Sequence, residues 1–240
     1  MGKRFWELDA ARGIAVVLMV LFHSFLYWQW TRGIVFPELN FGWLLAQRTA
    51  GTMFLLIVGI SMSISYSRAV ENKINLFKKY FFRAAFIFSL GVIITVFTAL
   101  FFPTYIVWFG VLHLIGVSVF LSFLALHYRL PKLFIAAAAI TIGFLSNSIF
   151  LQTPLLLWLG FPPTDFATFD YYPLLPWFGV VVAGAWLGEK IFPNGIERKW
   201  RVEAEGNNFV AKILCFLGRN SLAIYFIHLP AVAAFFKIVS

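Results

Sequence analysis

Long apolar runs dominate this sequence and limit what the chain can fold into. They are about 18 to 24 residues long, which is the length of a membrane-crossing helix, whereas a membrane barrel shows alternation over about ten residues. The chain of 240 residues is 61% hydrophobic and 12% charged, with a mean hydropathy of +0.86. This composition excludes a soluble protein. We therefore predict an all-α, polytopic membrane helix bundle that forms a single domain over 1–240.

Hydropathy predicts about seven transmembrane helices, with eight as the alternative. The segment Leu39–Ala50 either extends the second helix or forms a re-entrant piece. Gly184 and Gly188 form a GxxxG pair, a weak sign of close helix packing. The N-terminal run is too long for a cleavable signal, so we expect the first span to stay in place. The seven spans are 13–31, 49–67, 84–102, 106–126, 133–151, 173–189 and 213–236.

The net charge of +9 reflects topology rather than a nucleic-acid partner. With these spans, all but three of the 19 basic residues lie on one side of the membrane; the exceptions are Arg32, Arg48 and Lys237. The positive-inside rule then predicts a multi-pass protein of the cell membrane with a cytoplasmic N-terminus. The basic residues on the inner side are Lys3, Arg4, Arg12, Arg68, Lys73, Lys78, Lys79, Arg83, Arg129, Lys132, Lys190, Arg198, Lys199, Arg201, Lys212 and Arg219.

The stretch Glu7–Trp28 carries two ionisable groups on one helix face. Arg12 opens the apolar run and His23 lies deep inside it. They are eleven positions apart, just over three turns, and the rise between them is about 16 Å. An ionisable side chain near the middle of a bilayer is costly, so it indicates a functional site. A packed histidine bonded to a backbone carbonyl is the alternative.

Three histidines are expected at similar depth, slightly outward of the midplane. His23, His113 and His228 lie in three different predicted spans, about 15 to 19 Å from the inner edge. General acid–base chemistry suits them better than a metal site, because no pair has helical ligand spacing and no carboxylate lies at that depth. The single Cys215 excludes a cysteine-based metal site, and we expect no metal. His113, between two leucines, is the one most readily given a packing role.

Polar residues elsewhere in the last two spans are further candidates. Ser221, Tyr225 and His228 share a face of the last predicted helix. The first two either orient the imidazole and a ligand or bond neighbouring helices. Asp170 either holds a histidine or a cationic acceptor, or caps a helix.

Four inner cations border helix ends. They line a pocket for a phosphorylated cytosolic ligand or serve only as topology anchors. Asp9 is three residues before the first of them and is expected to pair with it. The four are Arg12, Lys79, Arg83 and Arg219.

Five segments in order resemble the prokaryotic members of the heparan-alpha-glucosaminide N-acetyltransferase catalytic-domain family. The likeness covers nearly the whole chain, and the pair Arg12 and His23 also resembles the wider transmembrane acyltransferase superfamily. The segments are Trp6–Gly13 followed by Phe22-His23, then Phe54–Ser61, Phe109–Gly116, Asp170–Gly179 and Leu217–Pro230.

This resemblance implies an enzyme that moves an acetyl or acyl group from cytosolic acyl-CoA to a glycan-like acceptor. Arg12 would belong to the donor end, with Lys79, Arg83 and Arg219 nearby, and His23 to the catalytic centre. The lysosomal enzyme of the family has Asn at the position of His23 and uses a later histidine.

This chain has no histidine between Ser24 and Trp43. His23, His113 or His228 must therefore supply the base, and Tyr225 or His113 the oxyanion contact. Acyl transfer either proceeds directly or passes through an acyl-histidine. The family likeness also implies a homodimer. A transporter or permease for an anionic small molecule is the rival class.

Overall fold

The computed structural model describes residues 5–33, 37–146, 149, 153–193, 195 and 208–239. Every regular element in this part of the chain is helical, which confirms the predicted all-α class. The chain divides into two compact units: unit 1 holds Met1–Ile57 and Arg201–Ser240, and unit 2 holds Val58–Trp200. The expectation of one domain over 1–240 stays a prediction.

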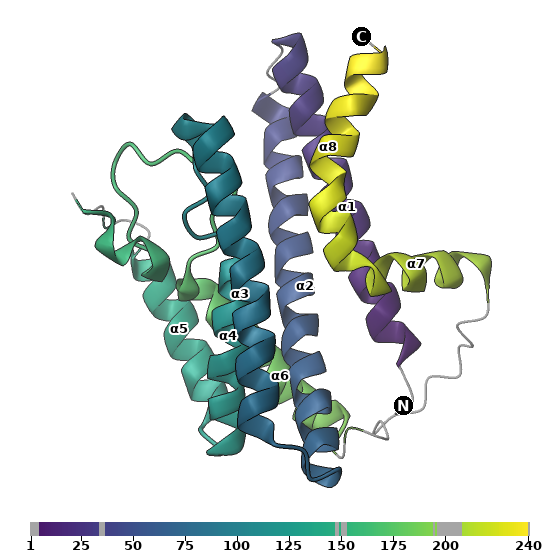
Figure 1. Cartoon of the computed structure of the whole chain (residues 1–240), viewed down its shortest axis with the longest axis vertical. Coiled ribbons are helices and arrows are strands. Elements are labelled where there is room, and N and C mark those ends of the chain that lie inside the picture. Colours follow the sequence, from purple (N-terminus) through teal and green to yellow (C-terminus); the bar gives the residue numbers. More distant parts are fainter. Residues whose placement is uncertain are drawn as a thin grey trace. The chain divides into compact units, whose positions relative to one another are not determined.

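Eight α-helices and two short 3-10 helices make up the described chain (Figure 1). The segment Leu39–Ala50 proves to be the beginning of a long second helix rather than a separate piece. The elements are α1 (Trp6–Arg32), α2 (Pro37–Glu71), α3 (Leu76–Phe101), η1 (Pro103–Tyr105), α4 (Val111–His127), α5 (Lys132–Ser146), η2 (Pro154–Leu159), α6 (Leu174–Ile191), α7 (Phe209–Arg219) and α8 (Ser221–Val239).

Four of the described helices, α1, α2, α3 and α6, are long and apolar enough to cross a membrane, and α7 with α8 can count as a fifth span. Helices α4 and α5 are also apolar but have only 17 and 15 residues. The protein is thus a membrane protein. Seven or eight spans and the cytoplasmic N-terminus stay predictions.

The last predicted span, 213–236, is wrong as a single helix. Helix α7 ends at Arg219, α8 begins at Ser221, and the two axes differ by 87°. Asn220 forms the elbow with φ −99° and ψ 16°, and its N–H bonds back to Phe216 O at 3.1 Å. An apolar run of the right length therefore conceals a right-angled turn.

The fourth predicted span also starts too early. Helix α4 begins at Val111 rather than at 106, because the preceding segment folds back onto α3. Thr98 Oγ1 accepts a hydrogen bond from the Val107 N–H at 3.0 Å, and Thr95 Oγ1 donates to Val107 O at 2.6 Å. These two threonines hold the chain in a loop where hydropathy alone suggests a helix.

Within unit 2, α2 and α6 approach each other closely. A side chain at Gly59 would overlap Val181 O, and a Cβ at Gly188 would lie 2.8 Å from the Ser63 Cβ. Glycine allows helix backbones to come this close in a membrane. The weak packing sign at Gly184 and Gly188 is therefore confirmed for Gly188.

Several basic residues used to predict the topology lie outside the described residues. This applies to Lys3, Arg4, Arg198, Lys199 and Arg201.

Candidate active site

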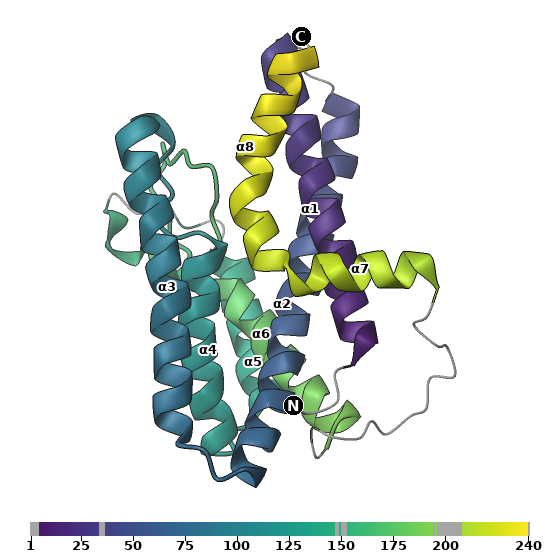
Figure 2. The same ribbon diagram turned by 45° about the vertical axis from the view of Figure 1, so that its right-hand side comes forward.

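Two of the predicted histidines meet in unit 1. Helices α1 and α8 lie side by side (Figures 1 and 2), and they bring the rings of His23 and His228 to a centroid distance of 4.8 Å at 65°. The ring of Tyr225, one turn earlier on α8, lies 5.8 Å from that of His228. The expected shared face of Tyr225 and His228 is thus present. The rings of His23 and His228 meet edge-to-face rather than stacked.

Each imidazole is fixed by a carbonyl of its own helix. His23 Nδ1 lies 2.9 Å from Met19 O, and His228 Nδ1 lies 2.7 Å from Tyr225 O. A carbonyl only accepts hydrogen bonds, so both Nδ1 atoms carry a proton and donate. In the neutral ring the other nitrogen, Nε2, then holds a lone pair. Both histidines are therefore held as the tautomer that can accept a proton at Nε2.

The Nε2 atom of His228 has no hydrogen-bond partner in the described part of the chain. The residue is only 5% exposed, and its Nε2 is a buried atom without a hydrogen-bond partner among the described residues. A buried polar atom without a partner costs free energy and calls for an explanation. An exchangeable proton on a bound ligand would provide one. The alternative raised from the sequence, a histidine bonded to a backbone carbonyl, accounts for Nδ1 of each ring but not for this nitrogen.

The start of α1 holds a cluster of charges that also draws in the elbow. Asp9 Oδ1 pairs with Arg12 at 3.3 Å, as the i, i+3 spacing predicts, and Asp9 Oδ2 accepts from Arg219 Nε at 3.2 Å. Sequence reasoning missed the second pair, because it joins residues from the two ends of unit 1. One carboxylate between two guanidiniums gives these three residues one net positive charge, and Glu7 adds a second carboxylate to the same turn.

The cluster sits where α7 crosses α1. A side chain at Gly218 would overlap Asp9 O, and one at Gly13 would overlap Leu214 O. Two glycines, one on each helix, therefore let the backbones touch. Small residues at a helix crossing are a usual membrane-packing signal, and the Arg-Gly and Gly-Arg pairs at 12–13 and 218–219 could have revealed it.

A family model described as the catalytic domain of heparan-alpha-glucosaminide N-acetyltransferase matches residues 4–230. The chain belongs to this family. Membership indicates a transmembrane acyltransferase and agrees with the likeness seen in the sequence. No curated protein and no solved structure matches the chain.

The third histidine, His113, uses both of its ring nitrogens in hydrogen bonds within unit 2. Its Nδ1 accepts from the Gly110 N–H at 3.2 Å, and its Nε2 lies 3.4 Å from Thr95 Oγ1. Since Thr95 donates its own proton to Val107 O, it accepts from the His113 Nε2–H. Both ring nitrogens are therefore used. We assign His113 to holding the start of α4 against α3, the packing role considered from the sequence.

Asp170 caps the N-terminus of α4, the helix that carries His113. Its Oδ2 accepts from the Val111 N–H at 2.9 Å and lies against Gly110. The carboxylate therefore supports the N-terminus of α4, where a negative charge is favourable. The sequence offered capping as one of two readings for Asp170, although it suggested the helix that follows the residue rather than α4.

The remaining predicted cations lie in unit 2. Lys79 Nζ donates to Ser65 O at 3.3 Å and lies 5.2 Å from the centre of the Tyr80 ring. Arg83 is exposed on the same helix. Ser221, the last of the predicted ligand residues, opens α8 directly after the elbow. A joint pocket of these cations with Arg12 and Arg219 stays a prediction.

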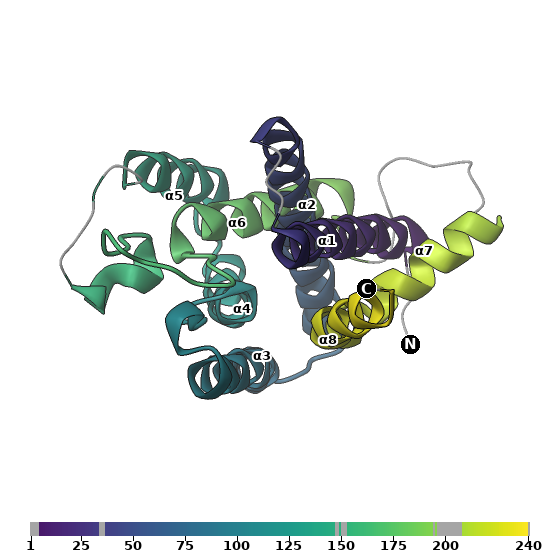
Figure 3. The ribbon, with the colours of Figure 1, turned by 90° about the horizontal axis from the view of Figure 1, so that it is seen from above.

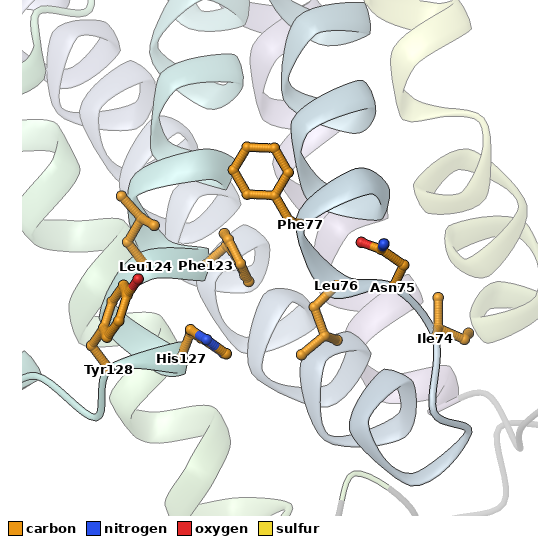
Figure 4. Close-up of a pocket in the computed structure, with 8 residues that line it drawn as sticks. All are labelled: Ile74, Asn75, Leu76, Phe77, Phe123, Leu124, His127 and Tyr128. Atoms are coloured by element: carbon orange, nitrogen blue, oxygen red, sulfur yellow. The ribbon is translucent and has the colours of Figure 1, made fainter.

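Unit 2 of this acyltransferase-family chain also carries a pocket of about 420 Å³ (Figure 4). Its one histidine, His127, has Nδ1 3.3 Å from the Tyr66 hydroxyl and stacks on Phe123. Among the described residues, no group of three or more His, Cys, Asp or Glu is placed to hold a metal ion. The pocket is lined by Ile74, Asn75, Leu76, Phe77, Phe123, Leu124, His127 and Tyr128.

Proposed function

We propose that the protein transfers an acetyl or acyl group from cytosolic acyl-CoA to an amine or hydroxyl of a glycan-like acceptor, with the His23–His228 pair as its chemical centre. The observation that carries this proposal is the geometry of the pair. Two imidazoles lie 4.8 Å apart, and each is held by a backbone carbonyl in the tautomer that presents a basic Nε2. A family of membrane acyltransferases supplies the reaction class.

In the proposed reaction His23 acts as the general base. The acceptor N–H or O–H gives its proton to His23 Nε2 while the nitrogen or oxygen attacks the thioester carbonyl. When the tetrahedral intermediate collapses, the carbon–sulfur bond breaks and the CoA sulfur takes the proton back from the imidazolium. Tyr225, next to His228, is our candidate for contact with the oxyanion. In a covalent variant His23 Nε2 itself attacks the thioester carbonyl, and CoA leaves as the thiolate. The acceptor then attacks the acyl-imidazolium, its proton passes to the thiolate, and the free imidazole is restored.

His228 is proposed to act on the same bound molecules. Its buried Nε2 has no partner among the described residues, so a ligand N–H or O–H would relieve the cost of burying it. Two neighbouring imidazoles, each with a basic Nε2, can orient an acceptor with two exchangeable hydrogens, such as an amine. This supports an amine acceptor at least as well as a hydroxyl.

The charged cluster at the start of α1 is proposed to bind the CoA phosphates. Arg219 contacts Asp9 through Nε, and its guanidinium is half-exposed, so it can also reach a phosphate. Arg12 and His23 are separated by about 16 Å of helix, so the donor would enter from this end and extend along α1. Lys79 and Arg83 remain in the proposal as further phosphate contacts. A cell-membrane location and a homodimer are also part of it.

The test is acetyl transfer by purified protein in nanodiscs, with acetyl-CoA as donor and glucosamine as acceptor. We expect His23→Gln to lower the rate of CoA release about 10²- to 10⁴-fold, the range for a general base, while acetyl-CoA binding by calorimetry is kept. His127→Gln serves as the matched control and should stay within about twofold of the parent rate. Arg12→Ala should weaken acetyl-CoA binding instead.

Two results would overturn the proposal. One is a folded His23→Gln, His228→Gln double variant that retains the parent rate. The other is a folded parent protein that neither binds acetyl-CoA nor releases CoA. If that protein moved an intact labelled anion into proteoliposomes, the transporter class would replace the enzyme.

A further inference from the structure

Helix α7 presents three different faces. The face against α1 is small and buried, with Ala211, Cys215 and Gly218. A second face is apolar yet open: Phe209 is 77% exposed, Phe216 65%, Val210 63% and Ile213 42%. Lys212 and Arg219 form the third face and are exposed as well. A short helix with an unpaired apolar face and a basic face is the pattern of a helix that lies in a membrane surface.

The contacts with α1 fix the level at which α7 lies. Gly218 rests against Asp9 O and Leu214 O rests against Gly13, so α7 crosses the second and third turns of α1. These turns are where the charged start of α1 gives way to the apolar run Ile14–Leu21. Because α1 is a candidate span, this change marks the edge of the hydrocarbon core.

The same contacts fix which way the faces point. Cys215 Sγ donates to Trp6 O at 3.4 Å, and Arg219 Nε donates to Asp9 Oδ2, so this edge of α7 points to the polar start of α1. Leu214 lies on the opposite edge, at Gly13, and Val210 is one turn before it on that edge. Val210 and Ile213 of the apolar face are thus turned toward the side on which α1 enters the bilayer, whereas Phe216 lies about 200° around the helix from Leu214 and points away from that side.

The elbow gives α7 the required direction. The 87° between α7 and α8 places α7 across the membrane normal if α8 runs along it. Figure 3 shows this relation, with α7 seen lengthwise and α8 nearly end-on. The 19 residues of α8 span about 28 Å, close to the thickness of a hydrocarbon core. Helix α8 alone can therefore serve as the span.

We propose that α7 is an interfacial helix whose partner is the headgroup–acyl boundary of the leaflet in which α1 begins. Val210 and Ile213 insert among the upper acyl chains, while Lys212 stays at the level of the phosphates. The insertion depth for such a helix is about 5–10 Å. This inference concerns membrane seating, and it holds whether or not the chain transfers acyl groups.

The experiment measures depth with nitroxide labels in nanodiscs of phosphatidylcholine and phosphatidylglycerol. Single cysteines replace Lys212, Val210 or Leu21; the last is exposed on α1, about 12 Å beyond Gly13 along the axis. Cys215 is buried, so the labelled parent chain measures its background and no replacement is needed. Power saturation with oxygen and with a water-soluble nickel chelate then reports the depth of each label.

We expect the depth order Lys212, Val210, Leu21, with the ratio of oxygen to nickel accessibility several-fold higher at Val210 than at Lys212. A Val210 label as deep as the Leu21 label would show instead that α7 re-enters the bilayer as part of a broken span. A Val210 label as accessible to nickel as the Lys212 label would show a water-facing surface. Either result overturns the inference.

Discussion

Replacing Gly218 with alanine should break the crossing of α7 and α1. A Cβ there would overlap Asp9 O and lie 2.9 Å from Asp9 C and 3.0 Å from Gly13 N. All three are backbone atoms that no side-chain rotation can move, so the two helices must separate. Overpacking of this kind costs about 1–3 kcal/mol, from which about 0.5–1 kcal/mol is recovered because alanine favours helix over glycine. The expected net loss is about 1–2 kcal/mol.

Gly42 provides the matched control. It is also a helical glycine of unit 1, but a Cβ there would meet no atom within 4 Å. Gly42→Ala should therefore gain about 0.5–1 kcal/mol from helix propensity alone. The two variants should differ by about 1.5–3 kcal/mol, which corresponds to about 3–12 °C in Tm for a chain of this size.

Thermal unfolding of both variants in the same nanodiscs, followed by circular dichroism, measures this difference. Both variants replace a helical glycine with alanine, so the gain in helix propensity cancels when their Tm values are compared. Equal Tm shifts would refute the reasoning, because they would mean that α1 and α7 are not in backbone contact at Gly218. A second readout is acyl transfer, which should fall for Gly218→Ala since the elbow positions α8 and its histidine.

Four further substitutions separate structural from chemical roles. Asp9→Asn should lower stability by about 1–2 kcal/mol, because two guanidiniums lose their shared carboxylate, and Tm in low and high salt measures it. His113→Asn should lower Tm yet keep the acyl-transfer rate within a few-fold; a loss as large as that of His23→Gln would contradict its structural assignment. Ser65→Ala removes the partner of the buried Tyr80 hydroxyl (3.1 Å) and should cost about 1 kcal/mol, whereas Ser122→Ala removes a buried hydroxyl without a partner among the described residues and should leave Tm unchanged or raised.

Counting residues along helices predicted the part of the site that depends on helix geometry alone. His23 and His228 were expected at similar depth because the rise per residue is constant, and their rings do meet. The Asp9–Arg12 pair followed from i, i+3 spacing in the same way. These inferences hold because neither needs knowledge of how the helices pack.

Features that depend on contacts distant in sequence could not be predicted. The elbow at Asn220 sits inside an apolar run, and the pairs that anchor it come from the start of α1. His113 seemed equivalent to the other histidines by depth, yet the Gly110 N–H and Thr95 occupy its two nitrogens. Hydropathy predicts neither the elbow nor the bonds of His113, because it measures how apolar a segment is and not which atoms its backbone contacts.

The His23–His228 pair also has a consequence for synthesis. Unit 1 is built from two segments that flank the whole of unit 2 in the sequence, and the pair takes one histidine from each. A growing chain therefore holds a solitary His23 while all of unit 2 is made, and the second imidazole arrives only with α8. Any product that stops before Ser221 would lack both the pair and the helix against which His23 packs. The proposed reactive centre can thus form only after the rest of the protein has been translated, which would keep unfinished chains inert.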